Sequence, residues 1–571
     1  MEKLTLLDFF CGAGGFSEGF RQECYEIING YDHWKPAVDT YNYNFGDGKG
    51  ILQDILEFEN SIELIENLPN TDVILGSPPC VSFSNSNNSG KADKSMGVKL
   101  TETFLRIVAV KKHQPNSTLK AWFMENVTNS TTYLAREYNF QDLGLYDWAK
   151  KHRLSPTKVA IKIDGNSVII NSAEYGSAQV RKRVITGELV SKGTLIVPSK
   201  THGEIKEIFD NNLQPFKKLG FIKNTLPKAN AKNSDELISD PLYPGLKIRQ
   251  SELTDHFYDT GLYESEWKNS RFLKVNHPYM GTMSFPENEG KPSRTITATK
   301  IGTSREAIIY KSEYNRTGDG EFRTPTVREA SCIMGFPITY QFIGSEGTKW
   351  RLVGNAVCPS VSRAFASVIR KELGMSKIIN LYLQIPKDLE NFPSLNSFEE
   401  KVFDSPRKRK DGSRFRRHPF KEGNLTVTLS NYDILKNEKE AGKWLTSIQY
   451  GNGEGFPSHL YIDGFYKQLE PIIETFENGK KFLEIINNGF SEKIAKGEML
   501  QKMYEDHRGV DLYKEPTELI ETIAQIINKI KFEEPTFIQN GNKIFAKERV
   551  PKKQVLALYA INKISTKANS N

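Results

Sequence analysis

The side chain best suited to covalent chemistry in this chain is the thiol of Cys80, which ends the run Gly76-Ser77-Pro78-Pro79-Cys80. An apolar stretch at residues 72–75 precedes the run and predicts a buried strand. The two prolines exclude helix and extend the backbone, and a polar loop follows at residues 82–90. A cysteine at the carboxyl end of a strand is placed as a nucleophile would be. Taken alone, it fits a small buried apolar residue better than a nucleophile, and only the rest of the chain reverses this preference.

Charged side chains that could handle protons or anions stand at the ends of two later segments. Glu125 follows an apolar strand at residues 121–124, and a carboxylate beside a strand end suits proton transfer. In residues 179–184, period-two alternation places Arg181 and Arg183 on one face, where they could bind phosphate or a carboxylate. The alternative for this segment is a solvent-exposed basic strand.

A glycine-rich turn near the N-terminus predicts a ligand that the backbone approaches closely. Residues 4–10 are typical of a strand, residues 11–15 of a tight turn and residues 16–21 of the start of a helix. Gly12 and Gly14 lie in the turn, and the helix start offers free amide groups. Such a strand–turn–helix is equally typical of a nucleotide site and of an ordinary tight turn.

Two acidic residues extend this candidate site. A second short strand at residues 25–30 ends near Asp32, where an acid can accept hydrogen bonds from two ribose hydroxyls. Asp54, in a third strand at residues 51–55, could accept from an adenine amino group. A solvated turn aspartate is the alternative for Asp32.

Composition limits the class of protein. The chain has 571 residues, which predicts two or three domains, and 38% of them are hydrophobic. No run of 18 apolar residues and no signal-peptide pattern is present, so we expect a cytoplasmic protein without a membrane span. Five scattered cysteines predict free thiols and no metal site. The net charge of +7 is a mild indication of a polyanionic partner.

Later segments organise the rest of the chain. Residues 158–164 and 167–171 predict two short strands paired with each other, and residues 187–292 are loop-rich and aromatic. Ordered patterns return at residue 292, and a helix is predicted from about 359 to 373. Beyond residue 376 the chain has a dense basic run at 405–418. It also has predicted strands at 424–429 and 460–462 and predicted helices at 466–489 and 516–531.

Taken together and in order, the motifs resemble those of the cytosine-C5 DNA methyltransferases over roughly residues 4 to 375. The resemblance includes the glycine turn, the Pro-Cys motif at Cys80, the Glu-Asn-Val motif at Glu125 and the Gln-x-Arg-x-Arg motif. Two departures are Ser77 in place of a glycine and Val81 in place of a glutamine. The matching stretches are residues 8–15, 77–80, 125–127, 179–183, 294–299, 328–337 and 354–357.

The resemblance implies an α/β fold: a Rossmann-like S-adenosylmethionine-dependent domain at residues 1–186, completed by about 350–375. It implies a small, loop-rich target-recognition domain at residues 187–349, whose specificity segment lies in the gap at 187–291. Residues 376–571 lie outside the resemblance, and we expect them to form a separate α+β module that adds DNA contacts.

The resemblance also implies roles for individual residues. Cys80 adds to carbon 6 of a flipped cytosine, and Glu125 holds or protonates ring nitrogen 3. Arg181 is expected to contact the base and Arg183 to give structural support. The methyl donor is S-adenosylmethionine, with no metal. Its expected contacts are Phe10, Gly12, Gly14, Asp32, Asp54, Pro79 and Asn355.

Double-stranded DNA is the expected substrate, and we expect a monomer that acts beside a restriction endonuclease specific for the same site. Three alternatives remain open: an RNA cytosine-C5 methyltransferase, a catalytically silent DNA-binding protein, and a methyltransferase fused to a nuclease in the C-terminal module. The length of the recognition gap argues against the first alternative, and the retention of Cys80, Glu125 and both arginines against the second.

Overall fold

The computed structural model forms two compact units, Met1–Lys401 and Val402–Asn571, and each is considered by itself. The division lies downstream of the boundary expected at 376. The structure describes the following residues: 3–79, 94–204, 212–231, 234–243, 245–275, 282–300, 302–378, 401–403, 417–422, 425–432, 438–440, 442–450, 458–506, 509–539, 545 and 548–570. Cys80, Val81, the polar loop at 82–90 and most of the basic run lie outside them.

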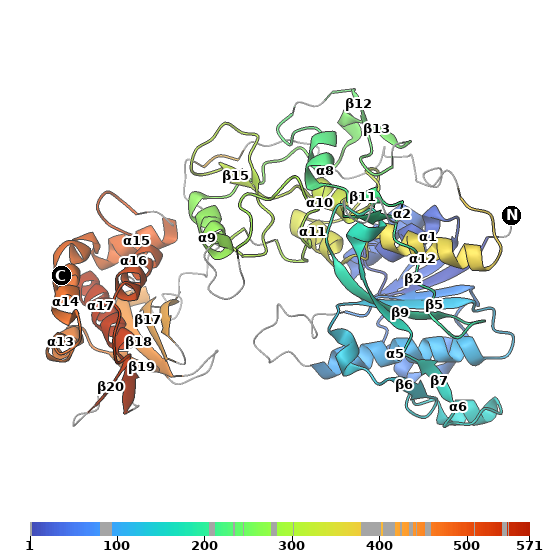
Figure 1. The fold of residues 1–571 in the computed structure, drawn as a ribbon, viewed down its shortest axis with the longest axis horizontal. Helices are drawn as coiled ribbons and strands as arrows, with labels where there is room; N and C mark the ends of the chain where they lie inside the picture. The colour runs from blue at the N-terminus through green and yellow to red at the C-terminus, as the bar shows by residue number, and fades with distance from the viewer. Residues whose placement is uncertain are drawn as a thin grey trace. The chain divides into compact units, whose positions relative to one another are not determined.

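A seven-stranded mixed sheet organises the first unit, with strand order β3-β2-β1-β4-β5-β9-β8 (Figure 1). The first five strands in this order are parallel, and β9 is antiparallel to both of its neighbours. The carboxyl ends of the parallel strands therefore meet at one edge, where an α/β sheet usually binds its ligand. The strands are β1 Thr5–Phe9, β2 Glu26–Asp32, β3 Gly50–Leu52, β4 Val73–Gly76, β5 Ala121–Asn126, β8 Ser167–Asn171 and β9 Lys182–Leu189.

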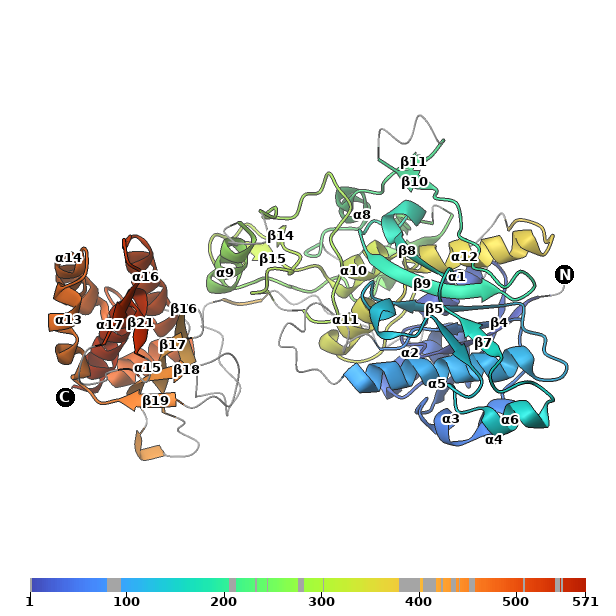
Figure 2. The ribbon, with the colours of Figure 1, turned by 60° about the horizontal axis from the view of Figure 1, so that its bottom comes forward.

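Both faces of this sheet are buried, which explains why its central strands β1, β4 and β5 are mostly apolar. Leu6 and Leu75 pack into one core, whereas their neighbours Leu7 and Ile74 pack into another, as period-two alternation requires. Helices α1 (Gly15–Gln22) and α12 (Pro359–Glu372) lie on one face, and α5 (Lys94–His113) lies on the other (Figures 1 and 2). The other helices of the sheet region are α2 Lys35–Phe45, α3 Glu57–Asn60, α4 Ile62–Glu66 and α6 Tyr146–Lys151.

One expected strand pair is wrong. Strands form at Val159–Lys162 (β7) and Ser167–Asn171 (β8), but β7 pairs with β6 (Glu137–Asn139) and β8 pairs with β9. Sequence proximity favoured a local hairpin. In the structure, β8 instead pairs with β9 and extends the seven-stranded sheet, while β7 pairs with β6 in a separate two-stranded sheet.

Apart from helix α9 (Glu264–Val275), the described part of residues 190–326 forms short elements, and buried ion pairs hold them in addition to apolar contacts. Lys274 Nζ lies 3.1 Å from Glu287, which also binds Arg294. Arg323 binds Glu329 in the helix that follows, with 2.8 Å between Nη1 and Oε2. The elements are β10 His202–Gly203, β11 Gln214–Pro215, α8 Leu219–Thr225, β12 Leu237–Ser239, β13 Lys247–Arg249, α9 Glu264–Val275, β14 Tyr310–Lys311 and β15 Phe322–Arg323.

Three helices complete the first unit: α10 (Val327–Met334), α11 (Glu346–Asn355) and α12. Thr326 caps α10 by accepting a hydrogen bond from the Glu329 N–H at 3.2 Å. The stretch Glu346–Glu372 is apolar and long enough to cross a membrane, yet 72% of its most apolar window is buried inside the unit. Such burial is typical of core helices.

The second unit is a four-stranded antiparallel sheet covered by a long helix, α17 (Lys552–Asn569). The sheet order is β16-β17-β18-β19, with bounds Arg417–Glu422, Leu425–Asn431, Trp444–Tyr450 and Ser458–Tyr461. Val427, Trp444 and Ile448 meet Leu558 and Ile561 of α17 in one core. The remaining elements are α13 Glu470–Glu474, α14 Gly479–Ile485, α15 Gly497–Asp506, α16 Pro516–Asn528, β20 Thr536–Ile538 and β21 Arg549–Pro551.

Candidate active site

Hydrogen bonds tie the Pro-Pro segment to the carboxyl edge of the sheet. The Ser77 N–H donates to Phe9 O at 3.1 Å, and the Ser77 hydroxyl donates to Phe10 O at 3.0 Å. From the end of β5, the Asn126 side-chain amide donates to Pro78 O at 3.2 Å. The hydroxyl that distinguishes Ser77 from glycine is therefore used to join β4 to β1. Cys80, which follows half-buried Pro79, lies outside the described residues.

Glu125 and Arg183 meet at the same edge. They come from the antiparallel pair β5–β9, in which Glu125 lies opposite Ile185 and Asn126 opposite Val184. Arg183 Nε lies 3.0 Å from Glu125 Oε1, and the side chains are 18% and 10% exposed. Burial raises the pKa of Glu125, although Arg183 and Arg181 oppose the shift. A carboxyl group whose pKa is raised by burial keeps its proton to a higher pH than an exposed one, which suits a role in proton transfer.

Arg181 has a different environment. One of its terminal nitrogens donates to Ile296 O at 3.0 Å, and the other donates to Gly354 O at 3.0 Å and Ala356 O at 3.2 Å. Arg181 therefore joins the chain just before β9 to two distant segments, whereas Arg183 is the arginine that contacts the Glu125 carboxyl group. These contacts favour a structural role for Arg181 and a role at the base for Arg183, the opposite of the predicted division. Gln179, which the sequence motif contains, accepts from the Ile296 N–H at 2.5 Å and strengthens the same junction.

The glycine turn between β1 and α1 leaves room for a ligand. Gly12 and Gly14 have φ of 52° and 81°, which L side chains rarely adopt. A Cβ at Gly14 would lie 2.5 Å from Phe45, whereas a Cβ at Gly12 would meet no described atom nearer than Phe10 O at 4.0 Å. The turn is therefore packed at Gly14 and open at Gly12. Phe10, just before it, is only 8% exposed and also has a positive φ, 55°, as strained residues at ligand sites often do.

Asp32 lies at the end of β2 and faces this turn. One carboxylate oxygen accepts from the Gly12 N–H at 2.9 Å, and the other accepts from the Trp34 N–H at 2.8 Å. Burial raises its pKa, against these two hydrogen bonds and the nearby His33. Each oxygen keeps acceptor capacity, so the carboxylate could also accept hydrogen bonds from the two hydroxyls of a ribose, such as the one in S-adenosylmethionine.

The other two expected cofactor residues lie on neighbouring elements. Asp54 follows β3, is exposed, and accepts from the Leu56 N–H at 3.0 Å. Asn355 is exposed at the end of α11. The chain just beyond it packs against the glycine turn, because a Cβ at Gly15 would lie 2.2 Å from Val357 O.

Sequence reasoning missed Asp8, which is fully buried in β1. The Ser17 hydroxyl donates to one of its oxygens at 2.6 Å, and the other oxygen has no hydrogen-bond partner among the described residues. Burial raises the pKa of Asp8 to about 7. An acid inside the apolar run Leu6-Leu7-Asp8-Phe9 was the available signal.

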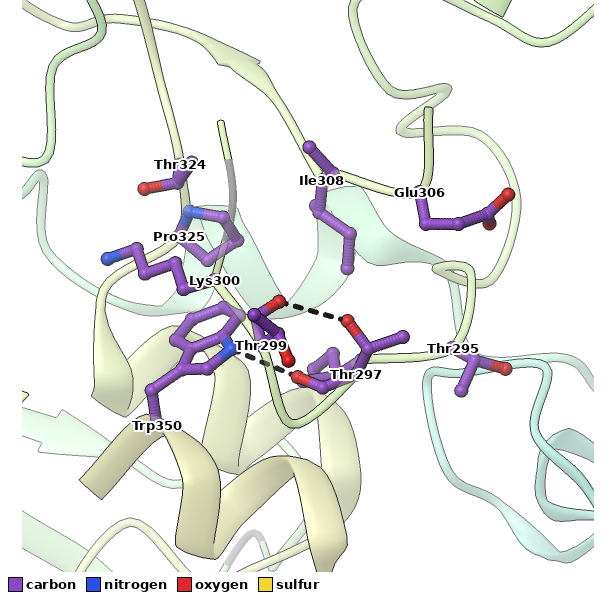
Figure 3. Close-up of a pocket in the computed structure, with 11 residues that line it drawn as sticks. Thr295, Thr297, Thr299, Lys300, Glu306, Ile308, Thr324, Pro325 and Trp350 are labelled. Carbon is purple, nitrogen blue, oxygen red and sulfur yellow. Dashed lines mark hydrogen bonds between the residues drawn. The ribbon is translucent and has the colours of Figure 1, made fainter. Parts of the chain in front are cut away.

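A small pocket is lined by Ile296, the residue that contacts both Gln179 and Arg181. Three alternate threonines line it, together with Lys300 and Trp350 (Figure 3). Trp350 Nε1 donates to Thr297 O at 3.0 Å, and Lys300 Nζ lies 2.6 Å from Glu346. The threonines are Thr295, Thr297 and Thr299.

Comparison with known proteins identifies the family. The family model for the C-5 cytosine-specific DNA methylases matches residues 4–371. Type II methyltransferase M.HgiDI of Herpetosiphon aurantiacus is 26% identical over 387 residues, which are 66% of this chain and 98% of that relative. Type II methyltransferase M1.HphI of Haemophilus parahaemolyticus is 26% identical over 374 residues, 64% of this chain and 87% of that relative.

Among solved structures, S. pombe Dnmt2 methyltransferase is similar with a TM-score of 0.40 and 15% identity, covering 65% of this chain and all of that one. The family match extends over the glycine turn, the Pro-Cys motif, the Glu125–Arg183 pair and α11. The chain belongs to the C-5 cytosine-specific DNA methylase family.

Proposed function

We propose that this C-5 cytosine DNA methyltransferase uses Cys80 as its nucleophile, Glu125 as the group that holds a proton at cytosine N3, and Arg183 as the cation that aligns Glu125 and binds the cytosine carbonyl oxygen. The observation that supports this most strongly is the buried Arg183–Glu125 pair, 3.0 Å apart, at the edge where Asn126 fixes Pro78.

Carbon 5 of cytosine is a poor nucleophile, and the proposed residues correct this. The Cys80 thiolate forms a bond to carbon 6, and the ring electrons move toward N3, where the carboxyl group of Glu125 donates or shares its proton. Carbon 5 then has enamine character and can attack an electrophilic methyl group. A base afterwards removes the carbon-5 proton, the N3 proton returns to Glu125, and the bond to carbon 6 breaks, which restores the ring and releases Cys80 as a thiolate.

S-adenosylmethionine, when bound, supplies that methyl group on a sulfonium centre. Asp32 would hold its ribose, and the cofactor could lie close to the backbone at Gly12, where no side chain is in the way. The remaining contacts would come from Phe10, Asp54, Pro79 and Asn355. These residues lie on β1, β2, β3, β4 and α11 or just beyond their ends, around one edge of the unit.

The relatives named as type II methyltransferases support a role as the modification enzyme of a restriction system, with an endonuclease specific for the same site. The recognition residues would lie within 187–291, where the chain forms short elements and loops that can reach base edges. We therefore propose that residues 187–349 form the target-recognition domain. The second unit would add phosphate contacts through the basic run at 405–418.

Bisulfite sequencing of genomic DNA from cells that express the chain tests this function. We expect 5-methylcytosine in one sequence context with the wild-type chain and none with Cys80→Ala. A wild-type chain that leaves DNA unmethylated but methylates tRNA would contradict the DNA assignment, and methylation by Cys80→Ala would contradict the mechanism.

A further inference from the structure

An exposed row of residues on α11 contains Asn355, which is proposed to contact the cofactor, and Arg351, which contacts the loop after β2. Gly347, Arg351 and Asn355 are spaced four apart and are the exposed residues of this helix. Residues four apart share one helix face. Arg351 therefore lies one turn before Asn355, on the side of α11 that is not packed into the core.

Arg351 contacts the loop after β2. Its guanidinium carbon lies 4.6 Å from the centroid of the Trp34 ring, a cation–π geometry. Trp34 is half-buried and directly precedes α2, and its N–H donates to Asp32 at 2.8 Å. A continuous run of contacts thus leads from Arg351 through Trp34 to the carboxylate proposed to hold the ribose.

The buried face of α11 is anchored to the rest of the unit. Lys349 Nζ lies 2.5 Å from Asp255, Trp350 donates to Thr297 O at 3.0 Å, and Gly354 O accepts from Arg181 at 3.0 Å. The helix is therefore a fixed support, and Arg351 transmits its position to the loop of Trp34.

We propose that Arg351 is a positioning residue for the methyl donor: by holding the Trp34 ring, it fixes the backbone amide that orients Asp32. This inference rests on the proposed function of the Asp32 cradle. It predicts that Arg351 affects binding of the donor while leaving the DNA-dependent part of the reaction unchanged.

The test is calorimetric binding of S-adenosylhomocysteine to the full chain without DNA. We expect Arg351→Met to raise the dissociation constant about three- to fivefold, because a partly exposed cation–π interaction is removed. Arg351→Lys, which keeps a cation over the ring, should recover part of the affinity. Trp34→Leu should weaken binding at least as much, and Arg351→Met should add little in that background.

Two further readouts separate positioning from general damage. The KM for S-adenosylmethionine should rise in Arg351→Met, while the KM for DNA and the midpoint of thermal unfolding without ligand stay at wild-type values. The matched control is Lys150→Met, which removes another exposed cation, 4.2 Å from the Tyr146 ring on α6, and should leave binding unchanged.

If wild type and Arg351→Met bound S-adenosylhomocysteine with equal affinity, the role of Arg351 would be overturned while the proposed function would stand. A full additional loss of affinity from Arg351→Met in the Trp34→Leu background would also overturn it, because Arg351 would then act without Trp34. A wild-type chain that binds no S-adenosylhomocysteine would overturn the proposed function and this inference together.

Discussion

Replacing Arg183 by methionine should leave the carboxyl group of Glu125 buried without its closest cation. Removal of one partner of a buried ion pair costs about 3–5 kcal/mol. The Arg183 side chain is 18% exposed and Glu125 can take up a proton, so we expect a decrease of about 2–3 kcal/mol in the free energy of unfolding at alkaline pH.

The decrease should depend on pH in a defined direction. Burial already raises the pKa of Glu125, and removal of Arg183 raises it further because Arg183 opposes the shift. Below this raised pKa the carboxyl is neutral and the missing cation matters little. Above it, the folded state carries an uncompensated charge, so the destabilisation grows as pH rises.

Urea unfolding at about pH 5.5 and about pH 8.5 measures this difference, and labelled-methyl transfer to DNA should fall by about 10²–10³ in kcat/KM. Arg181→Met is the control, because Arg181 donates to carbonyl oxygens and opposes the pKa shift of Glu125 less than Arg183 does, so its destabilisation should vary less with pH. The reasoning is refuted if Arg183→Met loses the same stability at both pH values, or if its activity stays within about threefold of wild type.

Three further predictions test other parts of the molecule. Burial raises the pKa of Asp8 to about 7, so folding takes up a proton and the stability of the wild type falls as pH rises from about 4 to 7. Relative to Asp8→Asn, the wild type should become less stable by about 3 kcal/mol over that range in urea unfolding, and parallel pH profiles of the two proteins would exclude this. Gly15→Ala places a Cβ 2.2 Å from Val357 O, so we expect about 1–3 kcal/mol of destabilisation and weaker S-adenosylhomocysteine binding, whereas a wild-type melting curve would show that this packing is not needed. Replacing the four basic residues at 407–410 by glutamine should reduce the salt dependence of DNA binding, by about 0.9 in log–log slope for each phosphate that the variant no longer neutralises, and an unchanged slope over a salt series would reject a role of this run in DNA binding.

Much of the site could be predicted because its residues stand where regular elements end. The glycine turn follows β1, Asp32 ends β2 and Glu125 lies next to the last residue of β5, so apolar runs bounded by polar residues located all three. The roles of the two arginines could not be predicted this way. Alternation places both on one face, but only the pairing of β5 with β9 decides which one reaches Glu125.

Other differences arose from tertiary contacts and backbone geometry. The helix expected at 466–489 is interrupted: α13 and α14 are separate, and Asn488 and Gly489 have non-helical backbone angles. Helix α17 was missed although residues 555–561 are strongly apolar. An apolar run of that length fits a buried strand equally well. Its helical form becomes clear only in the folded unit, where it packs across the face of the sheet that contains β17 and β18.

The most direct test of the account is the covalent bond between Cys80 and cytosine. A duplex that carries 5-fluorocytosine at the methylated position has no carbon-5 proton to lose, so the enzyme cannot be expelled after methyl transfer. With S-adenosylmethionine present, we predict an adduct whose mass is that of chain, DNA strand and methyl group, linked through Cys80 and absent in Cys80→Ala. An adduct at another residue, or an active enzyme that forms none, would contradict the mechanism.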